Sequence, residues 1–162
     1  MIDAETDVKQ WDAAVRALQA RQIRAMGQAT TRGVLLVERL SKLYLRTFTH
    51  PRGTPTPSPP GGPPALVTGH LRRSWRTIPA HAGLRPDTCE ASTGPTAVYS
   101  RIHELGGDIH QVRTRQGRHG LITRAVTIRL PRRPYLKPMT HAARREIHRG
   151  YVVAQISAIK GG

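Results

Sequence analysis

The sequence predicts an α+β fold, in which a long N-terminal helix and a C-terminal helix pack on a small, mainly antiparallel β-sheet with a long hairpin. Apolar residues recur at helical spacing near both ends of the chain, and a proline- and glycine-rich segment follows the first of these stretches. Between that segment and the last helical stretch, short runs bounded by glycine and proline are typical of strands. With 162 residues the chain has the length of one domain, and we expect a single domain over 1–162.

The first element that we expect is a long helix over residues 7–48. Acidic residues crowd its beginning, and Lys42 and Arg46 lie near its end, as the helix dipole favours. We interpret it as an amphipathic packing helix. The alternative, a free-standing coiled coil, needs an apolar seam that Gln22 and Gly33 interrupt. The apolar positions of the helical stripe are Val8, Trp11, Val15, Leu18, Met26, Ala29, Gly33, Val37, Leu40 and Tyr44.

Residues 50–64 are expected to form a loop or arm. Seven prolines and three glycines in this stretch exclude a helix or a central strand. Two interpretations stay open: a linker between helix and sheet, and an extended arm that lies on a neighbouring subunit. If it is such an arm, we expect its deletion to leave a folded chain that no longer assembles.

Residues 66–130 are expected to contain a short helix and the β-sheet. Thr68 is placed to cap a helix that carries Leu71 and Trp75 four positions apart. The segments expected after it are strands over 76–80 and 88–92, and one short helical turn or strand end over 97–105.

A long hairpin over 109–130, with a polar tip at 113–120, is expected to complete the sheet. Pro131 and Pro134 end it. Helical spacing then returns, and we expect a C-terminal helix over 139–160.

The composition excludes several classes of protein. Hydrophobic residues make up 38% of the chain and aromatic residues 4%, so the core must be built from aliphatic side chains. A single cysteine, Cys89, excludes an internal disulfide and a multi-cysteine zinc module. No signal peptide and no membrane span is expected, and the pattern is typical of a protein made in a reducing cytoplasm.

No motif of catalysis or metal binding is present. His103, Glu104 and His110 do not have the spacing that places two metal ligands on one helical face. Cys89 has no predictable base partner, so we interpret it as a small hydrophobic residue. The sequence therefore predicts no catalytic site, no metal and no cofactor, and a protein that is not an enzyme.

The net charge of +16 calls for an anionic partner or a well-solvated surface. The first 50 residues carry eight basic and five acidic residues, net +3, so the rest of the chain holds eighteen against five, net +13. Such a surplus of basic residues can bind the phosphates of a nucleic acid without recognising its bases. Few aromatic residues are available to stack on the bases of a single strand. The candidate contacts with DNA or with an acidic neighbour are Arg113, Arg115, Arg118 and Arg124.

Three segments of the chain resemble, in order, the motifs of one protein family. Residues 68–74 (TGHLRRS) resemble TG-x-LR-x-S, residues 98–107 (VYSRIHELGG) resemble YA-x-x-hE-x-G, and residues 131–138 (PRRPYLKP) resemble aRPFL-x-P before a last helix. With these motifs, the chain resembles the tail-completion, or head-to-tail joining (neck), proteins of tailed bacteriophages and the related Mu-like virion morphogenesis proteins. The match covers most of the chain, but Tyr135 replaces the usual Phe, and the stretch 110–124 is longer and more basic than in the family.

This resemblance implies a structural protein of the virion, located in its neck or tail end. It implies a homo-oligomeric ring, commonly a hexamer, between the connector and the tail tube, with neck and tail-tube proteins as partners, contact with packaged DNA and no membrane. One alternative, supported by charge alone, is a non-specific DNA-binding basic protein. A further alternative is an enzyme, such as a small nuclease that uses His103 and Glu104.

The resemblance also implies roles for ten residues in the fold and its assembly. Gly69, Leu71 and Arg72 shape the entry to the sheet, and Tyr99, Glu104 and Gly106 form a strand-to-turn corner. Arg133, Pro134, Leu136 and Pro138 anchor the final helix.

Overall fold

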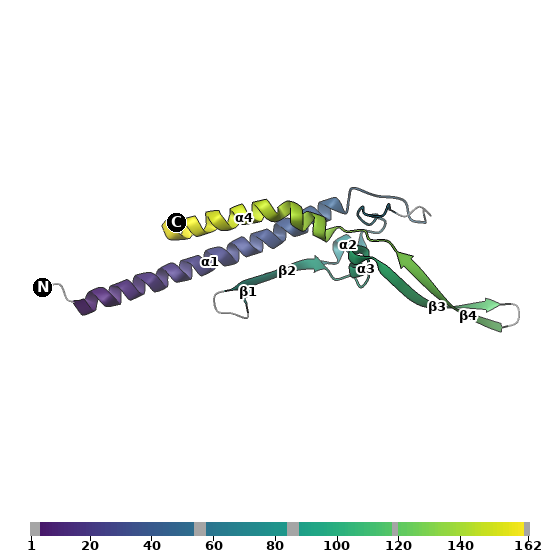
Figure 1. Cartoon of the computed structure of the whole chain (residues 1–162), viewed down its shortest axis with the longest axis horizontal. Helices are drawn as coiled ribbons and strands as arrows, with labels where there is room; N and C mark the ends of the chain where they lie inside the picture. Colours follow the sequence, from purple (N-terminus) through teal and green to yellow (C-terminus); the bar gives the residue numbers. More distant parts are fainter. Residues whose placement is uncertain (1–3, 54–57, 84–87, 118–119, 161–162) are drawn as a thin grey trace. The chain divides into compact units, whose positions relative to one another are not determined.

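A computed structural model describes residues 4–53, 58–83, 88–117 and 120–160 of the chain (Figure 1). The predicted class is confirmed: the chain is α+β, and a long N-terminal helix and a C-terminal helix pack on small antiparallel β-structure. The elements are, in order, α1 (Ala4–Tyr44), α2 (His70–Arg73), β1 (Trp75–Ala82), β2 (Cys89–Pro95), α3 (Ser100–Leu105), β3 (Gly107–Gly117), β4 (Gly120–Leu130) and α4 (Leu136–Lys160). None of the described helices is long and apolar enough to cross a membrane.

The chain divides into two compact units. The first unit comprises Met1–Leu40, Arg76–Gly94 and Thr140–Gly162, and the second comprises Ser41–Trp75 and Pro95–Met139. The expectation of a single domain stays a prediction.

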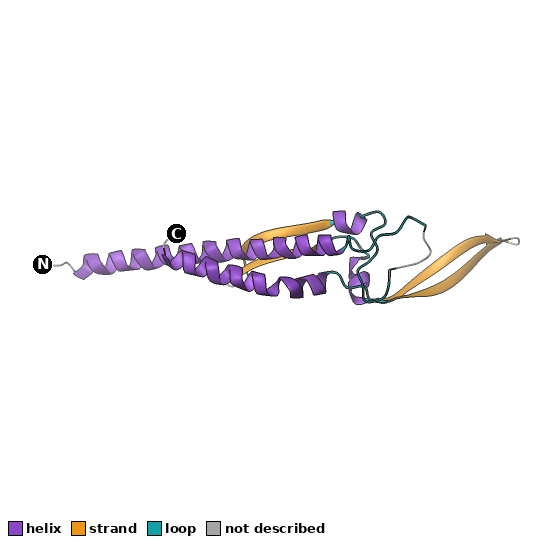
Figure 2. Ribbon diagram, turned by 90° about the horizontal axis from the view of Figure 1, so that it is seen from above, coloured by secondary structure: helices purple, strands orange, loops and turns teal. Residues whose placement is uncertain are grey.

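In the first unit, α4 runs antiparallel to α1 and alongside it (Figure 2). Gly33 allows the close approach, because a Cβ there would lie only 3.4 Å from Cγ2 of Ile147. One turn away, the hydroxyl groups of Thr30 and Tyr151 are hydrogen-bonded at 2.8 Å. The helices are therefore joined by the small-residue contact at Gly33 and by the hydrogen bond between Thr30 and Tyr151.

Strands β1 and β2 form a two-stranded sheet that is held to α1 by polar side chains. The hydroxyl oxygen of Thr31 accepts the N–H of Ala80 at 3.0 Å. Thr77 donates its hydroxyl proton to the carboxylate of Glu38 and lies 2.7 Å from the hydroxyl of Thr93. Hydrogen bonds thus fix the strands along this helix with little apolar burial.

The core of the second unit is small and centres on two aromatic rings, so the expectation of a core built from aliphatic side chains is wrong for this unit. Trp75 and Tyr135 pack edge to face, with ring centroids 6.2 Å apart, and Tyr135 is only 2% exposed. The cluster of buried residues is Leu45, Leu71, Trp75, Ala97 and Tyr135. Because this core is small and the chain has few aromatic residues, the stability of the second unit depends on each of the two rings.

Strands β3 and β4 form a second two-stranded sheet, here called the ribbon. They pair antiparallel from Gly107↔Leu130 to Gly117↔Gly120. The strands thus form two separate sheets, where the sequence analysis expected one. The expected polar tip over 113–120 is wrong in extent, because 113–117 belong to β3; residues 118–119 lie outside the described part of the chain.

The proline-rich segment packs on the second unit over its described residues 58–64. Ser58 is buried, and its carbonyl oxygen accepts a 2.9 Å hydrogen bond from Nε of Arg133. The N–H of Gly61 donates to the carbonyl of Arg132 at 2.9 Å. Deletion of 50–64 would leave the buried Arg133 guanidinium without this acceptor, so the structure argues against the expectation that the chain folds without the loop.

Several helix ends differ from the sequence predictions: α1 begins at Ala4 rather than at residue 7, and α4 begins at Leu136 rather than at residue 139. α1 ends at Tyr44, earlier than the expected residue 48, and the hydroxyl of Thr47 donates to the Tyr44 carbonyl there. Gly69, with φ 71°, occupies the N-cap position of α2, while Thr68 accepts the N–H of His70 at 3.3 Å. Thr68, which was expected to cap this helix, therefore lies one residue before the N-cap.

Candidate functional site

The three motif segments come together in the second unit. Leu71 of the first segment and Tyr135 of the third belong to the same buried cluster. Tyr135 also donates its hydroxyl to the carbonyl of Ser100, in the second segment, at 3.4 Å. Residues far apart in the chain thus form one packed site, called the motif cluster below.

Glu104 caps the first turn of α4. Its carboxylate accepts the backbone N–H groups of Tyr135, Leu136 and Lys137 at 2.9, 3.0 and 2.9 Å. These donors have no acceptor within the helix, and the positive end of the helix dipole favours a negative charge at this place. Pro138 follows without an N–H of its own. Glu104 therefore anchors the final helix, a role that the resemblance assigned to residues of the third segment.

Gly106 locks the second segment against the third. Its φ is 71°, and a Cβ there would lie 2.7 Å from Cγ of Arg132 and 3.2 Å from the carbonyl oxygen of Leu130. Next to it, the N–H of Arg133 donates to the carbonyl of His103 at 2.7 Å. A side chain at 106 would be both strained and obstructed, so this position requires glycine.

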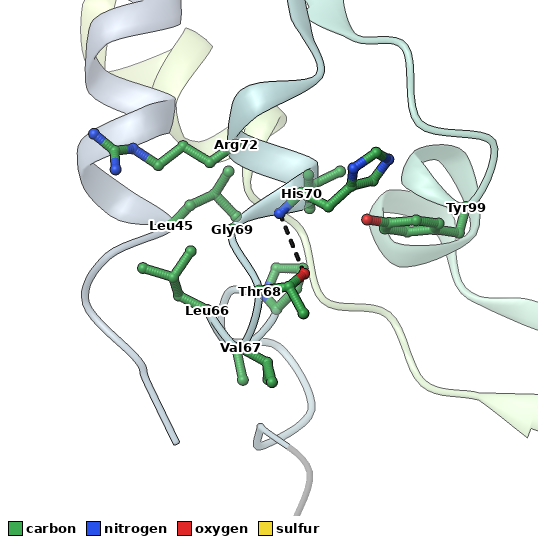
Figure 3. Close-up of a pocket in the computed structure, with 11 residues that line it drawn as sticks. Leu45, Leu66, Val67, Thr68, Gly69, His70, Arg72 and Tyr99 are labelled. Atoms are coloured by element: carbon green, nitrogen blue, oxygen red, sulfur yellow. Dashed lines mark hydrogen bonds between the residues drawn. The ribbon is translucent and has the colours of Figure 1, made fainter. Parts of the chain in front are cut away.

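Four motif residues line a small pocket beside α2 (Figure 3): Gly69, Leu71, Arg72 and Tyr99. Its volume is about 80 Å³, well below the roughly 300 Å³ at which small-molecule sites begin. The Arg72 side chain points away from His70 and Tyr99 (Figure 3), and its buried Nε has no hydrogen-bond partner in the described part of the chain. The pocket is therefore a packing defect of the motif cluster and too small for a metabolite.

Burial shifts two titratable groups of the motif cluster. Burial, and then the positive charge of Arg133, lower the pKa of the His103 imidazole below its ordinary value. Burial, and then the negative charge of Glu104, raise the pKa of the Tyr135 hydroxyl. Both groups are therefore held neutral near pH 7, as suits residues that pack.

The ribbon gathers arginines on one face. Side chains of a strand alternate between faces, so Arg113 and Arg115 lie on the same side, and Arg124 lies directly opposite Arg113. All three are exposed. Like charges opposite each other destabilise a strand pair, and a bound anion would relieve this repulsion.

The other candidate arginine of the ribbon, Arg118, lies outside the described residues. Nearer the base of the ribbon, Arg129 pairs with Asp108 at 3.5 Å, but the Arg129 side chain is 89% exposed, so this ion pair contributes little. The positive charge of the ribbon is thus not offset by its one acidic residue.

A basic groove between α1 and α4 in the first unit was not found from the sequence. Its volume is about 660 Å³, and among the described residues that line it Glu146 is the only acidic one. The arginines that line this α1–α4 groove are Arg21, Arg24, Arg32 and Arg149. The first three recur at spacings that share one helical face, and this signal could have found them.

The chemistry-bearing residues are occupied in packing. Both carboxylate oxygens of Glu104 bind backbone N–H groups, and Nδ1 of His110 lies 2.9 Å from the Thr127 hydroxyl on the ribbon. Cys89 is a half-buried free thiol. Among the described residues, no three His, Cys, Asp or Glu side chains are grouped as a metal site requires. The prediction that the chain is not an enzyme stays a prediction.

Comparison with known proteins identifies no relative: no protein-family model, no curated protein and no solved structure matches the chain.

Proposed function

We propose that the chain is a structural protein of a tailed bacteriophage. In this proposal it forms a homo-oligomeric ring in the neck of the virion, where it joins the connector to the tail tube. Neck and tail-tube proteins are its partners, and packaged DNA passes its basic surfaces.

The convergence of the three motif segments carries the proposal. Glu104 of the second segment caps the helix that the third segment begins, and Gly106 packs against Arg132. Leu71 of the first segment shares the core with Tyr135 of the third. A chance resemblance in three separate segments gives no reason for the matching residues to contact one another, whereas a shared family framework does.

Exposed apolar side chains support assembly into a larger structure. A subunit of a ring covers such side chains with its neighbours, and repeated head-to-tail contacts close into a ring when the rotation between copies permits it. Exposed apolar residues of the two units include Val8 (60%), Trp11 (70%), Val112 (72%), Leu121 (72%), Val153 (56%) and Ile159 (60%).

The first test is the assembly state of the purified chain. Light scattering during size-exclusion chromatography and negative-stain electron microscopy should reveal a closed ring of fixed copy number. A chain that stays monomeric across the accessible concentrations would contradict the ring.

The second test is made in a phage that encodes the chain. Interrupting its gene should yield DNA-filled heads and separate tails, and expression of the intact gene should restore joined particles. Infectious, normally joined particles from the interrupted gene would overturn the proposed function.

The shared arginine face of the ribbon favours one other function, non-specific DNA binding. The probe is an Arg113→Ala/Arg115→Ala/Arg124→Ala variant, tested in gel shifts with duplexes of unrelated sequence at low salt. A monomeric wild type that binds all duplexes equally, and a variant that loses this binding, would favour the DNA-binding protein over the ring.

A further inference from the structure

We propose that the α1–α4 groove binds the N-terminal part of α1, residues 4–18, from a second copy of the chain. This inference rests on the proposed function and deepens it, because it names the contact between successive subunits of the ring. Both surfaces belong to the first unit.

The docking segment is an exposed amphipathic helix with an acidic rim. α1 continues beyond the end of α4 toward its own N-terminus (Figures 1 and 2), and there Trp11 is 70% and Val8 60% exposed. Val8, Trp11 and Val15 recur at helical spacing, with Asp7 and Asp12 at the two edges of this stripe. A large exposed indole within an apolar stripe is typical of an interface anchor.

The α1–α4 groove offers the complementary chemistry. It is lined by four arginines and by small or apolar side chains, of which Ala25 and Ala154 are half-buried and Ala158 is buried. The side chains of Arg21, Arg32 and Arg149 form no ion pair with any residue in the described ranges. An apolar floor with a basic rim matches an apolar stripe with an acidic rim, which is how an amphipathic helix is recognised in a groove.

The distribution of acidic residues favours this occupant over nucleic acid. Four of the ten acidic residues of the chain fall within its first twelve positions. A duplex would pair its phosphates with the arginines but leave Val153, which is 56% exposed, without an apolar contact. The helix from a second copy satisfies both the charges and the apolar floor.

The contact must be intermolecular and directional. The docking segment and one wall of the α1–α4 groove belong to the same unbroken helix, Ala4–Tyr44, so the segment cannot fold back into its own groove. Each copy carries one segment and one groove on different surfaces. Such a heterologous contact passes from copy to copy, and it closes into a ring when the rotation between copies permits it.

The direct test measures binding of a fluorescent peptide of residues 4–20 to the full chain by anisotropy. The receptor carries Trp11→Ala, which weakens competition from its own segment. We expect saturable binding, reduced at least about ten-fold by Arg24→Glu/Arg149→Glu in the receptor or by Asp7→Lys/Asp12→Lys in the peptide. The matched control, Arg113→Glu/Arg124→Glu on the ribbon, makes the same change of charge and should leave peptide binding unchanged.

A charge-swap experiment tests the contact in assembly. We expect neither the Asp7→Lys/Asp12→Lys chain nor the Arg24→Glu/Arg149→Glu chain to form rings alone, and the two chains mixed in equal amounts to form them again. Circular dichroism spectra like that of the wild type would show that both variants are folded.

The outcomes separate this inference from the proposed function. Rings formed equally well by wild type and both variants would overturn the contact and leave the proposed function standing. Peptide binding by a chain that forms no ring would support the contact and contradict the ring. A third outcome would overturn the contact and assign the α1–α4 groove to DNA. In that outcome the peptide does not bind, whereas a 20-base-pair duplex binds the wild type and does not bind the Arg24→Glu/Arg149→Glu variant.

Discussion

In the second unit, one carboxylate, that of Glu104, accepts three backbone N–H groups at the start of a helix. In the first unit, by contrast, α1 and α4 meet through the hydroxyl pair of Thr30 and Tyr151 and through the close approach at Gly33, and they leave a basic groove between them. The polar groups of the motif cluster are thus used within the second unit, while the arginines of the α1–α4 groove form no ion pair in the described ranges and remain available to partners. We therefore expect substitutions in the motif cluster to destabilise the fold. Substitutions in the α1–α4 groove should leave the chain folded but prevent its assembly.

The largest expected effect is that of Glu104→Ala, which should destabilise the second unit by about 3 kcal/mol. It removes a charged acceptor from three helix N–H groups, and charge-assisted hydrogen bonds and caps each contribute roughly 1 to 3 kcal/mol. Urea unfolding, followed by Trp75 emission in a Trp11→Phe background, measures the change. Glu146→Ala, at an exposed carboxylate of the α1–α4 groove, is the control and should change stability by less than about 0.5 kcal/mol. If Glu104→Ala and Glu146→Ala changed the free energy of unfolding equally, the proposed difference between the motif cluster and the α1–α4 groove would be contradicted.

The next largest effect is expected from replacing a glycine by alanine, which should lower stability in the second unit and raise it in the first. Gly106→Ala should cost about 2 kcal/mol, because the residue has a positive φ and Arg132 occupies the space of the new methyl group. Gly27→Ala, inside α1, meets nothing within 4 Å and should gain up to about 1 kcal/mol from helix propensity. Thermal unfolding by circular dichroism measures both. A gain in stability at 106 would show that the lock between the second and third motif segments is weak.

The smallest expected effect is a pH dependence that arises from His103. Its pKa is lowered in the folded chain, so between that value and the unfolded value of about 6.5 the unfolded state binds more protons. Stability of the second unit should therefore fall as the pH drops below about 6.5, and His103→Gln should reduce this fall. Urea midpoints between about pH 7.5 and 5.5 measure it, and His110→Gln, on the exposed ribbon, should behave as the wild type does. If stability fell with pH in His103→Gln as it does in the wild type, a group other than His103 would cause the fall.

Local patterns predicted most of the fold. The apolar stripe of the first helical stretch, the prolines after residue 50 and the turn residues of the middle section fixed the kind and order of the elements. The extent of β3 was missed because 113–117 are polar and lie on an exposed ribbon, so no apolar alternation marks them. The division into two sheets was missed because strand pairing is a long-range property that periodicity does not report.

The sequence named candidate residues of the motif cluster, but it did not predict which groups they contact. Glu104, Gly106 and Arg133 were singled out by the resemblance, yet their partners lie elsewhere in the chain. Glu104 binds backbone groups at the start of α4, and Arg133 binds the carbonyl of Ser58. Because backbone groups are the same in every residue, no side-chain pattern identifies these acceptors and donors. The α1–α4 groove arises only when two helices distant in sequence lie side by side.

The ribbon has a consequence for the life of an unassembled copy. A two-stranded sheet with both faces in water is at best marginally stable, so its strands open often. Its exposed arginines are cleavage sites for trypsin-like proteases, which act on opened, extended backbone. A free copy would therefore be nicked in the ribbon, while a copy whose ribbon is covered by a neighbour or by DNA would be protected. In the proposed ring, the same arginines that suit an anionic partner would thus make the ribbon the place where an unassembled copy is cleaved first.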